Sequence, residues 1–408
     1  MKELRCDAAG AQSAILTINA GSSSVKLAVY AGGAELTCTL KGDLSGTGTK
    51  AARFVATCGE ERDERAVEAP DHEAAANFVL AWLEEHGVLE SVDGVGHRVV
   101  HGLEHAAPAS ITAELIAQLH QAVAYAPEHL PAELRLIEAI AERKPHLPQV
   151  ACFDTAFHST MPRVARLLPI PRRYQRPGVR RYGFHGLSCE YLLEELARLA
   201  GPEAANGRVL LAHLGNGASI TAVNGGRSLE TTMGFTPSGL VMSTRSGDLD
   251  PGLVLHLAKT ENMTPAQFDR MAHRESGLLG VSETSSDMRE LLAQEQTDAR
   301  AADAVALFCY QARKSVGALA TVIGGLDTLV FSAGIGERSA PIRARICDGL
   351  AFLGIEVDER RNQTSAPLIS TDSSRVAVRV IPTDEQLMIA RAASRVLGLS
   401  AEIARRRA

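Results

Sequence analysis

The sequence lacks the features that mark several large protein classes. Aromatic residues make up only 4% of the 408 residues, and there is one tryptophan. The seven cysteines are scattered and never form a C-x-x-C pair, which argues against a disulfide framework or a zinc site and fits a reducing compartment. No uncharged apolar run approaches the ~20 residues of a membrane span. The segment from Met1 to Ser13 lacks the apolar stretch of a signal peptide and is expected to be an extension.

Basic residues are also not in excess. The chain has 42 Lys and Arg against 48 Asp and Glu, so nothing indicates a nucleic acid or a membrane surface as partner. The segment from Asn19 to Lys26 lacks the second glycine of a Walker A loop, and no Gly-x-Gly-x-x-Gly follows the first predicted strand. The length suggests two or three domains, and the expected location is cytoplasmic.

Recurring strand and glycine-turn patterns predict an α/β protein. Ala14–Tyr30 has the pattern of a hairpin that turns at Gly21–Ser24. An apolar run with a glycine turn returns at residues 209–223 and again at 328–336. This recurrence suggests duplicated halves, although such turns occur in any α/β protein. Helices are predicted over 71–86, with Asp71 as cap, over 298–323, and over 383–397, opening with a Thr383/Gln386 capping box.

Several polar residues lie at predicted strand ends or in loops, where they could bind phosphate or carboxylate groups. Asp154 follows an apolar strand, where α/β proteins place ligands, and could orient an acceptor, deprotonate it, bind Mg²⁺ through water, or merely cap a helix. Arg98 lies near the end of a strand and suits bidentate binding of a carboxylate or phosphate. His185 lies between glycines in an arginine-flanked loop. Arg245 is a lone cation among hydroxyls and acids, and is the best candidate to stabilise a transferring phosphoryl group.

Each of these residues also has a purely structural interpretation, as part of an exposed strand, a turn or a solvated loop. For Glu385, in the first turn of the last helix, complementing the helix dipole is the default interpretation. Together, however, the glycine turns, the arginines and the absence of a Ser/His/Asp arrangement fit phosphoryl transfer, which depends on positioning and charge neutralisation.

A set of longer motifs supports this interpretation. In order from Ile15 to Gly398 they read INAGSSSVK, GHRVVHG, FDTAFH, RYGFHG, HLGNG, MGFTP, TRSGDLDPG, GLLGVS, SSDMREL, FSAGIGERS and IPTDEQ. The chain therefore resembles the acetate kinase (acetokinase) family of the acetate and sugar kinase/Hsp70/actin superfamily. The resemblance implies an α/β fold of two duplicated lobes with an interlobe nucleotide cleft, and a homodimer. The N-terminal lobe would be 1–154 with a returning helix 388–408, and 155–387 the nucleotide-binding and dimerisation lobe.

The resemblance also implies roles for individual residues. Asp154, His185 and Arg245 would be catalytic, and Asn19 and Glu385 would bind Mg²⁺, with Mn²⁺ as an alternative. The acyl substrate would contact Arg98, Val100, His129, Phe184 and Pro237. ATP would contact Lys26, the turn His213, Leu214, Gly215, Asn216 and Gly217, the segment Asp287, Met288 and Arg289, and the loop Gly334, Ile335, Gly336, Glu337 and Arg338. The implied reaction is reversible transfer from ATP to acetate, giving ADP and acetyl phosphate.

The chain departs from the family in the acyl pocket. Where the family has Ala-Pro-Leu-His-Asn-Pro, this sequence has Glu128 in place of the leucine and Leu130 in place of the asparagine. A buried carboxylate is costly, so Glu128 must be paired, protonated or turned outward. The preferred acyl group therefore stays open, with a propionate or butyrate kinase as the alternative. A non-catalytic module of the actin/Hsp70 kind is disfavoured because Arg98, Asp154, His185 and Arg245 are all present.

Overall fold

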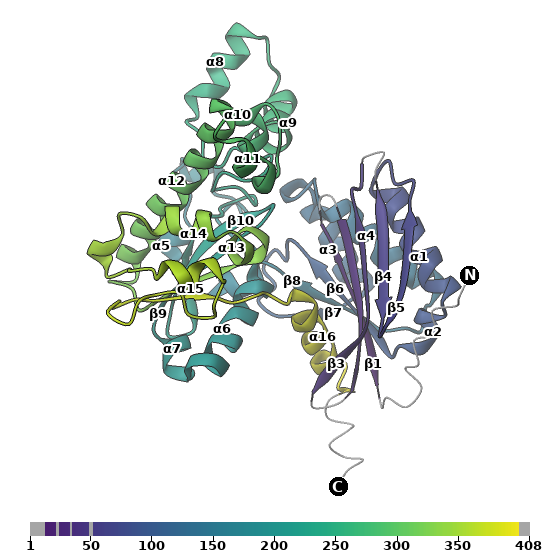
Figure 1. Cartoon of the computed structure of the whole chain (residues 1–408). Coiled ribbons are helices and arrows are strands. Elements are labelled where there is room, and N and C mark those ends of the chain that lie inside the picture. The colour runs from purple at the N-terminus through teal and green to yellow at the C-terminus, as the bar shows by residue number, and fades with distance from the viewer. Residues whose placement is uncertain (1–12, 22–23, 33–34, 49–51, 400–408) are drawn as a thin grey trace. The chain divides into compact units, whose positions relative to one another are not determined.

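The computed structural model describes residues 13–21, 24–32, 35–48 and 52–399 (Figure 1). The expected N-terminal extension, the turn residues Ser22 and Ser23, and the end of the expected returning helix lie outside these ranges. The chain divides into two compact units, one within residues 1–156 and 384–408, the other within 157–383. We call them unit 1 and unit 2 and describe each by itself.

Unit 1 is built on a sheet of eight strands in the order β5-β4-β3-β2-β1-β6-β8-β7. Their bounds are β1 (Ala14–Ala20), β2 (Ser24–Gly32), β3 (Leu36–Ser45), β4 (Arg53–Cys58), β5 (Glu61–Ala66), β6 (Gly94–Val99), β7 (Ala109–Ser110) and β8 (Gln149–Phe153). Strands β1 to β5 pair antiparallel, as the predicted hairpin requires, whereas β1, β6 and β8 are parallel. Every residue of β1 and β8 is buried, as expected for strands covered on both faces.

Helices cover both faces of this sheet. They are α1 (His72–Glu85), α2 (Val88–Ser91), α3 (Ala113–Ala122), α4 (Leu130–Arg143) and α16 (Glu385–Val396). The predicted cap of α1 is confirmed, because Asp71 Oδ1 accepts from the Ala74 N–H at 2.8 Å. Leu16 and Ile18 of β1 share a buried cluster with residues of α1 and α4. On the opposite face, Gly96 makes room for α16, since a Cβ there would lie 2.6 Å from Ile389 Cγ2.

The start of α16 differs from the sequence-based expectation. The capping box of Thr383 and Gln386 is wrong, because the N-cap is Asp384, whose Oδ1 accepts from the Leu387 N–H at 2.9 Å. Asp384 Oδ1 also accepts from the Tyr30 hydroxyl at 3.3 Å. The cap therefore ties the last helix to strand β2, and Glu385 becomes the first residue of the helix.

Unit 2 repeats the central arrangement of unit 1. Its sheet has the order β11-β10-β9-β12-β13, with β9 (Arg208–Leu214), β10 (Ala218–Asn224), β11 (Arg227–Thr231), β12 (Thr328–Ser332) and β13 (Ala377–Val380). As in the set β3-β2-β1-β6-β8, three antiparallel strands precede two parallel ones. The same order and the same directions in both units confirm the duplication that the glycine turns suggested.

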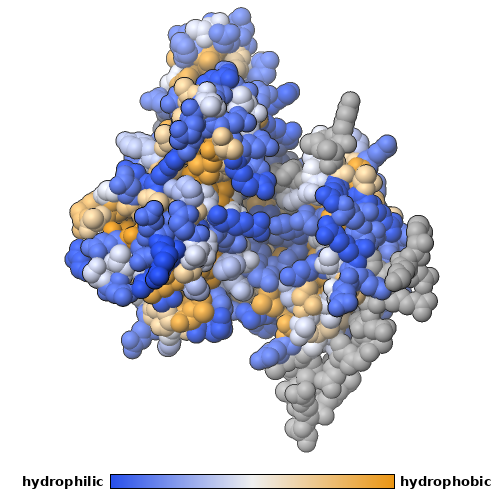
Figure 2. Space-filling view, in the orientation of Figure 1, coloured by the Kyte–Doolittle hydropathy of each residue, from blue (hydrophilic) through white to orange (hydrophobic). Residues whose placement is uncertain are grey.

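The helices of unit 2 include the long predicted one. They are α5 (Arg163–Arg166), α6 (Gly186–Ala200), α7 (Pro202–Asn206), α8 (Gly252–Thr260), α9 (Pro265–Arg274), α10 (Gly277–Ser282), α11 (Met288–Gln294), α12 (Ala299–Val322), α13 (Ala333–Arg338), α14 (Ala340–Cys347) and α15 (Glu359–Gln363). Asp298 caps α12. Among the described residues, no helix is long and apolar enough to cross a membrane. The face in Figure 2 is largely hydrophilic, with separate apolar patches.

Candidate functional site

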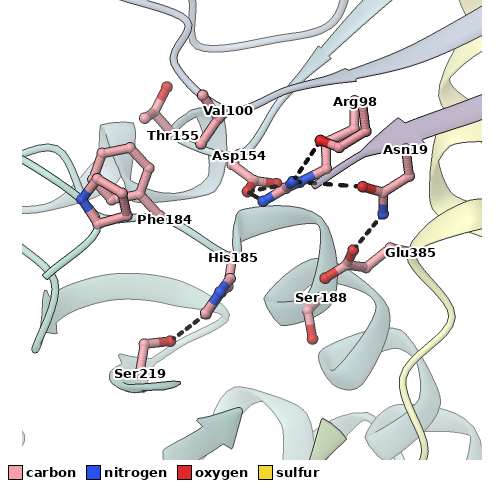
Figure 3. A network of polar contacts seen from close by, with 12 residues as sticks. Asn19, Arg98, Val100, Asp154, Thr155, Phe184, His185, Ser188, Ser219 and Glu385 are labelled. Atoms are coloured by element: carbon pink, nitrogen blue, oxygen red, sulfur yellow. Dashed lines mark hydrogen bonds and ion pairs between the residues drawn. The ribbon is translucent and has the colours of Figure 1, made fainter. Parts of the chain in front are cut away.

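Four predicted site residues of unit 1 form one polar network (Figure 3). Arg98 lies on β6, Asp154 directly follows β8, Asn19 lies on β1 and Glu385 opens α16. Arg98 donates from Nε and Nη2 to Asp154 Oδ2, at 3.0 and 2.6 Å. Asn19 donates from Nδ2 to Glu385 Oε2 at 2.8 Å, and Arg98 Nη1 lies 3.5 Å from Asn19 Oδ1. The fold thus joins residues up to 366 positions apart.

The topology explains why these residues meet. Strands β1, β6 and β8 are parallel neighbours, so their carboxyl ends lie at one edge of the sheet. The first turn of α16 reaches the same edge through its contact with β1 and β6. Loops at such an edge carry the side chains that bind ligands, while the strands hold the backbone fixed.

The Arg98–Asp154 pair is deeply buried. The side chain of Arg98 is 11% exposed and that of Asp154 is 0% exposed. Burial by itself lowers the pKa of Arg98, but the carboxylates of Asp154 and Glu385 outweigh it and raise that pKa. The guanidinium is therefore always charged, as the binding of an anion requires.

The other predicted residues of unit 1 lie around this network. Lys26 is exposed on β2 and stands opposite Asn19 in the strand register. Val100 is buried just after β6, and His129 is buried at the N-cap of α4. Glu128, the departure from the family, is half-buried immediately before that cap.

In unit 2, two predicted histidines stack on each other. The rings of His185 and His213 lie 4.1 Å apart and 26° from parallel. His185 Nδ1 is 2.9 Å from Ser219 Oγ (Figure 3). His185 has a φ of 60° as the N-cap of α6, a conformation that costs energy in a non-glycine residue and recurs at functional sites. A Cβ at Gly217 would lie 3.1 Å from His185 Nε2, so a larger residue in the predicted phosphate turn would press on the His185 ring.

The predicted arginine loop lies against the same turn. Ser243 N donates to the Asn216 carbonyl at 3.3 Å, and Ser243 Oγ lies 3.4 Å from Asn216 Oδ1. Arg245 Nη1 donates to the Pro237 carbonyl at 2.8 Å. The fold thus brings the arginine loop, the turn at residues 215–217 and the loop of Pro237 together. Phe184, next to His185, is buried, and its carbonyl is 2.8 Å from His158 Nε2.

The remaining nucleotide candidates lie at two helix starts. The segment 334–338 belongs to α13, whose Ala333 Cβ is 3.4 Å from the position of a Cβ on Gly215, so this helix adjoins the turn. Asp287 caps α11 by accepting from the Arg289 N–H at 2.8 Å. Arg289 Nη2 also donates to Asp287 Oδ2, at 2.5 Å. Met288 follows the cap and is buried.

Comparison with known proteins places this arrangement in a family. The acetokinase family matches residues 14–391. An acetate kinase of Rhodopseudomonas palustris is 45% identical over 386 residues, covering 92% of this chain and 96% of that protein. An acetate kinase of Nitrobacter hamburgensis is 47% identical over 384 residues, covering 92% and 94%. A solved propionate kinase from Francisella tularensis is 36% identical, with a TM-score of 0.87, covering 94% of this chain and 100% of that chain. The chain belongs to the acetokinase family.

Two residues of this acetokinase family member contact predicted site residues but carry no motif signal in the sequence. Glu133, in the first turn of α4, is 2% exposed, and its Oε2 accepts from the Val100 N–H at 2.9 Å. Its spacing of three residues from Leu130 and four from Ile137 places it on the apolar face, which is the signal that could have marked it.

The second missed residue is Ser188, on α6. Its Oγ lies 2.8 Å from His213 Nδ1 and 2.8 Å from Thr383 Oγ1. Thr383 N in turn donates to Glu337 Oε1 at 3.1 Å. This chain of hydrogen bonds connects the predicted phosphate turn with α13. A buried serine on a helix has no sequence signal that indicates such a connection.

Proposed function

We propose that this chain is an acetate kinase, which transfers the γ-phosphoryl group of ATP to acetate in a reversible, Mg²⁺-dependent reaction. An acetate oxygen attacks the γ-phosphorus in line as the bond to ADP breaks, and acetyl phosphate and ADP form. The observation that carries the proposal is the network of Asn19, Arg98, Asp154 and Glu385. It combines a permanent cation for a carboxylate with oxygen ligands for a divalent metal.

In this proposal Arg98 binds the acetate carboxylate. Asp154 holds the guanidinium through two hydrogen bonds to one oxygen and acts as the catalytic acid/base or positioning carboxylate. Val100 and His129 in unit 1, and Phe184 and Pro237 in unit 2, contact the acyl group. The buried side chains of Val100 and Phe184 suit an alkyl end.

The residues present fit a magnesium ion. No group of three His, Cys, Asp or Glu side chains among the described residues could hold a metal by itself. Mg²⁺ typically takes one or two carboxylates together with waters and substrate phosphates. Glu385 and the amide oxygen of Asn19 would hold the ion, which neutralises charge on the ATP phosphates when bound.

Unit 2 supplies the groups assigned to ATP. His185 and Arg245 stabilise charge on the transferring phosphoryl group, because positioned hydrogen-bond donors and cations contribute most where negative charge develops. The turn from His213 to Gly217 holds phosphates with its backbone N–H groups. Lys26 contacts the phosphates from unit 1, residues 287–289 contact the ribose side, and residues 334–338 line the adenine.

The proposal extends to assembly, location and lobe boundaries. A homodimer is supported by the resemblance and by exposed apolar side chains of unit 2, such as Leu255 on α8 and Tyr310 on α12. A cytoplasmic location is supported by the free thiols of Cys38, Cys152, Cys189, Cys309 and Cys347, although Cys58 is disulfide-bonded. We propose that the two lobes correspond to unit 1 and unit 2, whose boundaries at 156/157 and 383/384 lie within a few residues of the implied ones at 154/155 and 387/388. Sedimentation equilibrium tests the dimer, which a monomer at micromolar concentration would exclude.

Steady-state kinetics over C2 to C4 acids with ATP and Mg²⁺ tests the activity. We expect acetate-dependent formation of ADP and of acetyl phosphate, trapped as the hydroxamate. Absence of acid-dependent ADP formation, with an intact fold, would refute the proposal and favour a non-catalytic nucleotide-binding module.

Propionate is the second candidate substrate, because Glu128 replaces a leucine beside the proposed acyl pocket. The variant Glu128→Leu tests this position, with Glu138→Gln on the exposed side of α4 as a control. If the carboxylate points into the pocket, Glu128→Leu improves kcat/KM for acetate by one or two orders of magnitude, since roughly a few kcal/mol of repulsion disappears. If it points outward, the change is that of filling the pocket, on the order of 1–3 kcal/mol per methylene.

A further inference from the structure

Unit 1 contains a buried carboxyl group that the proposed reaction does not use. Glu133 lies in the first turn of α4 and is 2% exposed. Its neighbours along the apolar face of the helix, Leu130, Leu134 and Ile137, are likewise buried. Carboxyl groups are rarely placed in such surroundings because ionisation without water is costly.

One oxygen of Glu133 has a clear structural role, and the other has none. Oε2 accepts from the Val100 N–H at 2.9 Å. Within the described part of the chain, Oε1 is buried without a hydrogen-bond partner. Val100 is two residues after Arg98, so the contact fixes the segment that carries the proposed acyl-binding arginine.

The charges around Glu133 are already unfavourable to a further carboxylate. The charged groups that act on it are Arg98 and Asp154. Arg98 carries one positive charge, which Asp154 already pairs with and on which Glu385 also acts. If Glu133 ionised, three carboxylates would share one guanidinium before any substrate bound.

The charged residues on the other helices that pack on α4 do not offset the excess negative charge near Glu133. Helix α1 meets it through the ion pair of Glu73 with Arg135, whose side chains are 57% and 53% exposed. Helix α3 meets it through His120 and Glu138, 52% and 39% exposed. Both pairs lie on the solvent side. Consistently, burial raises the pKa of Glu133 to about 8, against the opposing effects of Arg98 and of the Val100 N–H.

We propose that Glu133 is a positioning residue for Arg98 and that it must be uncharged when the substrate carboxylate binds. The neutral carboxyl keeps its hydrogen bond to Val100 and does not compete with substrate for the guanidinium. The ionised form adds a negative charge to a buried site that must accept an anion, and it pulls Arg98 away from the position of the substrate. The inference rests on the proposed function and deepens it.

The consequence is a pH dependence of substrate binding rather than of turnover. Acetate remains ionised above neutral pH, so its own titration does not contribute. In the wild type, KM for acetate is expected to rise above about pH 8, by up to about tenfold per pH unit for a single ionisation, while kcat at saturating acetate stays level. In Glu133→Gln, which retains the acceptor for Val100, KM is expected to be independent of pH over the same range. The control Glu138→Gln should behave as the wild type.

A second measurement does not depend on catalysis. Infrared difference spectra of wild-type protein should show a protonated carboxyl band near neutral pH that disappears above about pH 8, and Glu133→Gln should lack it. A wild-type KM that does not change with pH, an equal rise in Glu133→Gln, or absence of the band overturns the inference. If no acid supports ADP formation at any pH, the proposed function fails instead, and the infrared band alone decides the state of Glu133.

Discussion

At the scale of single residues, Arg245 has the most direct proposed part in the chemistry. Its Nη1 donates to the Pro237 carbonyl at 2.8 Å, and Ser243 of the same loop contacts Asn216 in the proposed phosphate turn. We expect Arg245→Ala to lower kcat by roughly 10³-fold or more, as for other arginines that neutralise a transferring phosphoryl group. ATP affinity, measured by calorimetry, should change much less.

Arg270→Ala provides the matched control. Arg270 is exposed on α9 and pairs only at the surface with Glu275, at 2.7 Å, and such pairs contribute little. Near-normal turnover in Arg245→Ala, with a normal control, would contradict the assignment.

Two roles are possible for the Glu385 carboxylate, and a variant can distinguish them. As a metal ligand it should set the Mg²⁺ requirement, whereas as a charge at a helix start it should affect only stability. We expect Glu385→Ala to raise the Mg²⁺ concentration for half-maximal activity by roughly tenfold or more. Asp384→Ala is the matched control, because it removes the actual cap of the same helix. If both variants lose stability and neither shifts the Mg²⁺ titration, the helix-dipole interpretation holds.

At the scale of elements, the sequence predicted what depends on local pattern. The hairpin of β1 and β2, the cap of α1 and the long helix α12 all follow from alternation, an Asp cap and helical periodicity. The start of α16 was mispredicted because two competing caps stand side by side, and the contact of Asp384 with Tyr30 on β2 decides between them. A contact between residues 354 positions apart has no local signal.

The site residues likewise divide into those with a local sequence signal and those that depend on contacts between distant segments. The motifs identified Arg98, Asp154, His185 and Arg245 by residue type and loop position. They could not identify Glu133 or Ser188, because each acts through a neighbour, one through the Val100 N–H and the other through the His213 ring. Hydrogen bonds between distant segments appear only after the chain is folded.

A variant of Ser188 tests the connection between α6 and the proposed phosphate turn. Removing its hydroxyl leaves His213 without the bond at Nδ1, and an unsatisfied buried group costs about 1–3 kcal/mol. We expect Ser188→Ala to lower kcat/KM for ATP roughly tenfold, with a smaller effect on KM for acetate. Arg198→Gln, exposed on the same helix, should match the wild type. Equal losses for both substrates would indicate a general packing defect.

At the scale of the whole molecule, each unit contains a histidine that burial keeps neutral. His97, on β6 in unit 1, lies 2.7 Å from Gln149 Oε1, and His158, in unit 2, lies 2.9 Å from Ser228 Oγ. Burial lowers the pKa of both histidines to about 4. In the unfolded chain their pKa returns to the ordinary value near 6.5. Between these values the unfolded state binds more protons, so stability falls as the pH falls through this window.

We therefore expect the free energy of unfolding to decrease from about pH 6.5 to about pH 4, by up to ~1.4 kcal/mol per pH unit for each histidine. Glu133 acts in the opposite sense: its pKa is raised on folding, so its contribution is present at low pH and is lost as the pH rises from about 4.5 to about 8. Urea unfolding across this range measures both effects. His97→Gln should flatten the acid slope for unit 1 and His158→Gln that for unit 2, because each removes one titrating group. If the units unfold separately, the two variants change different transitions; an unchanged slope in both would show that other groups govern acid unfolding.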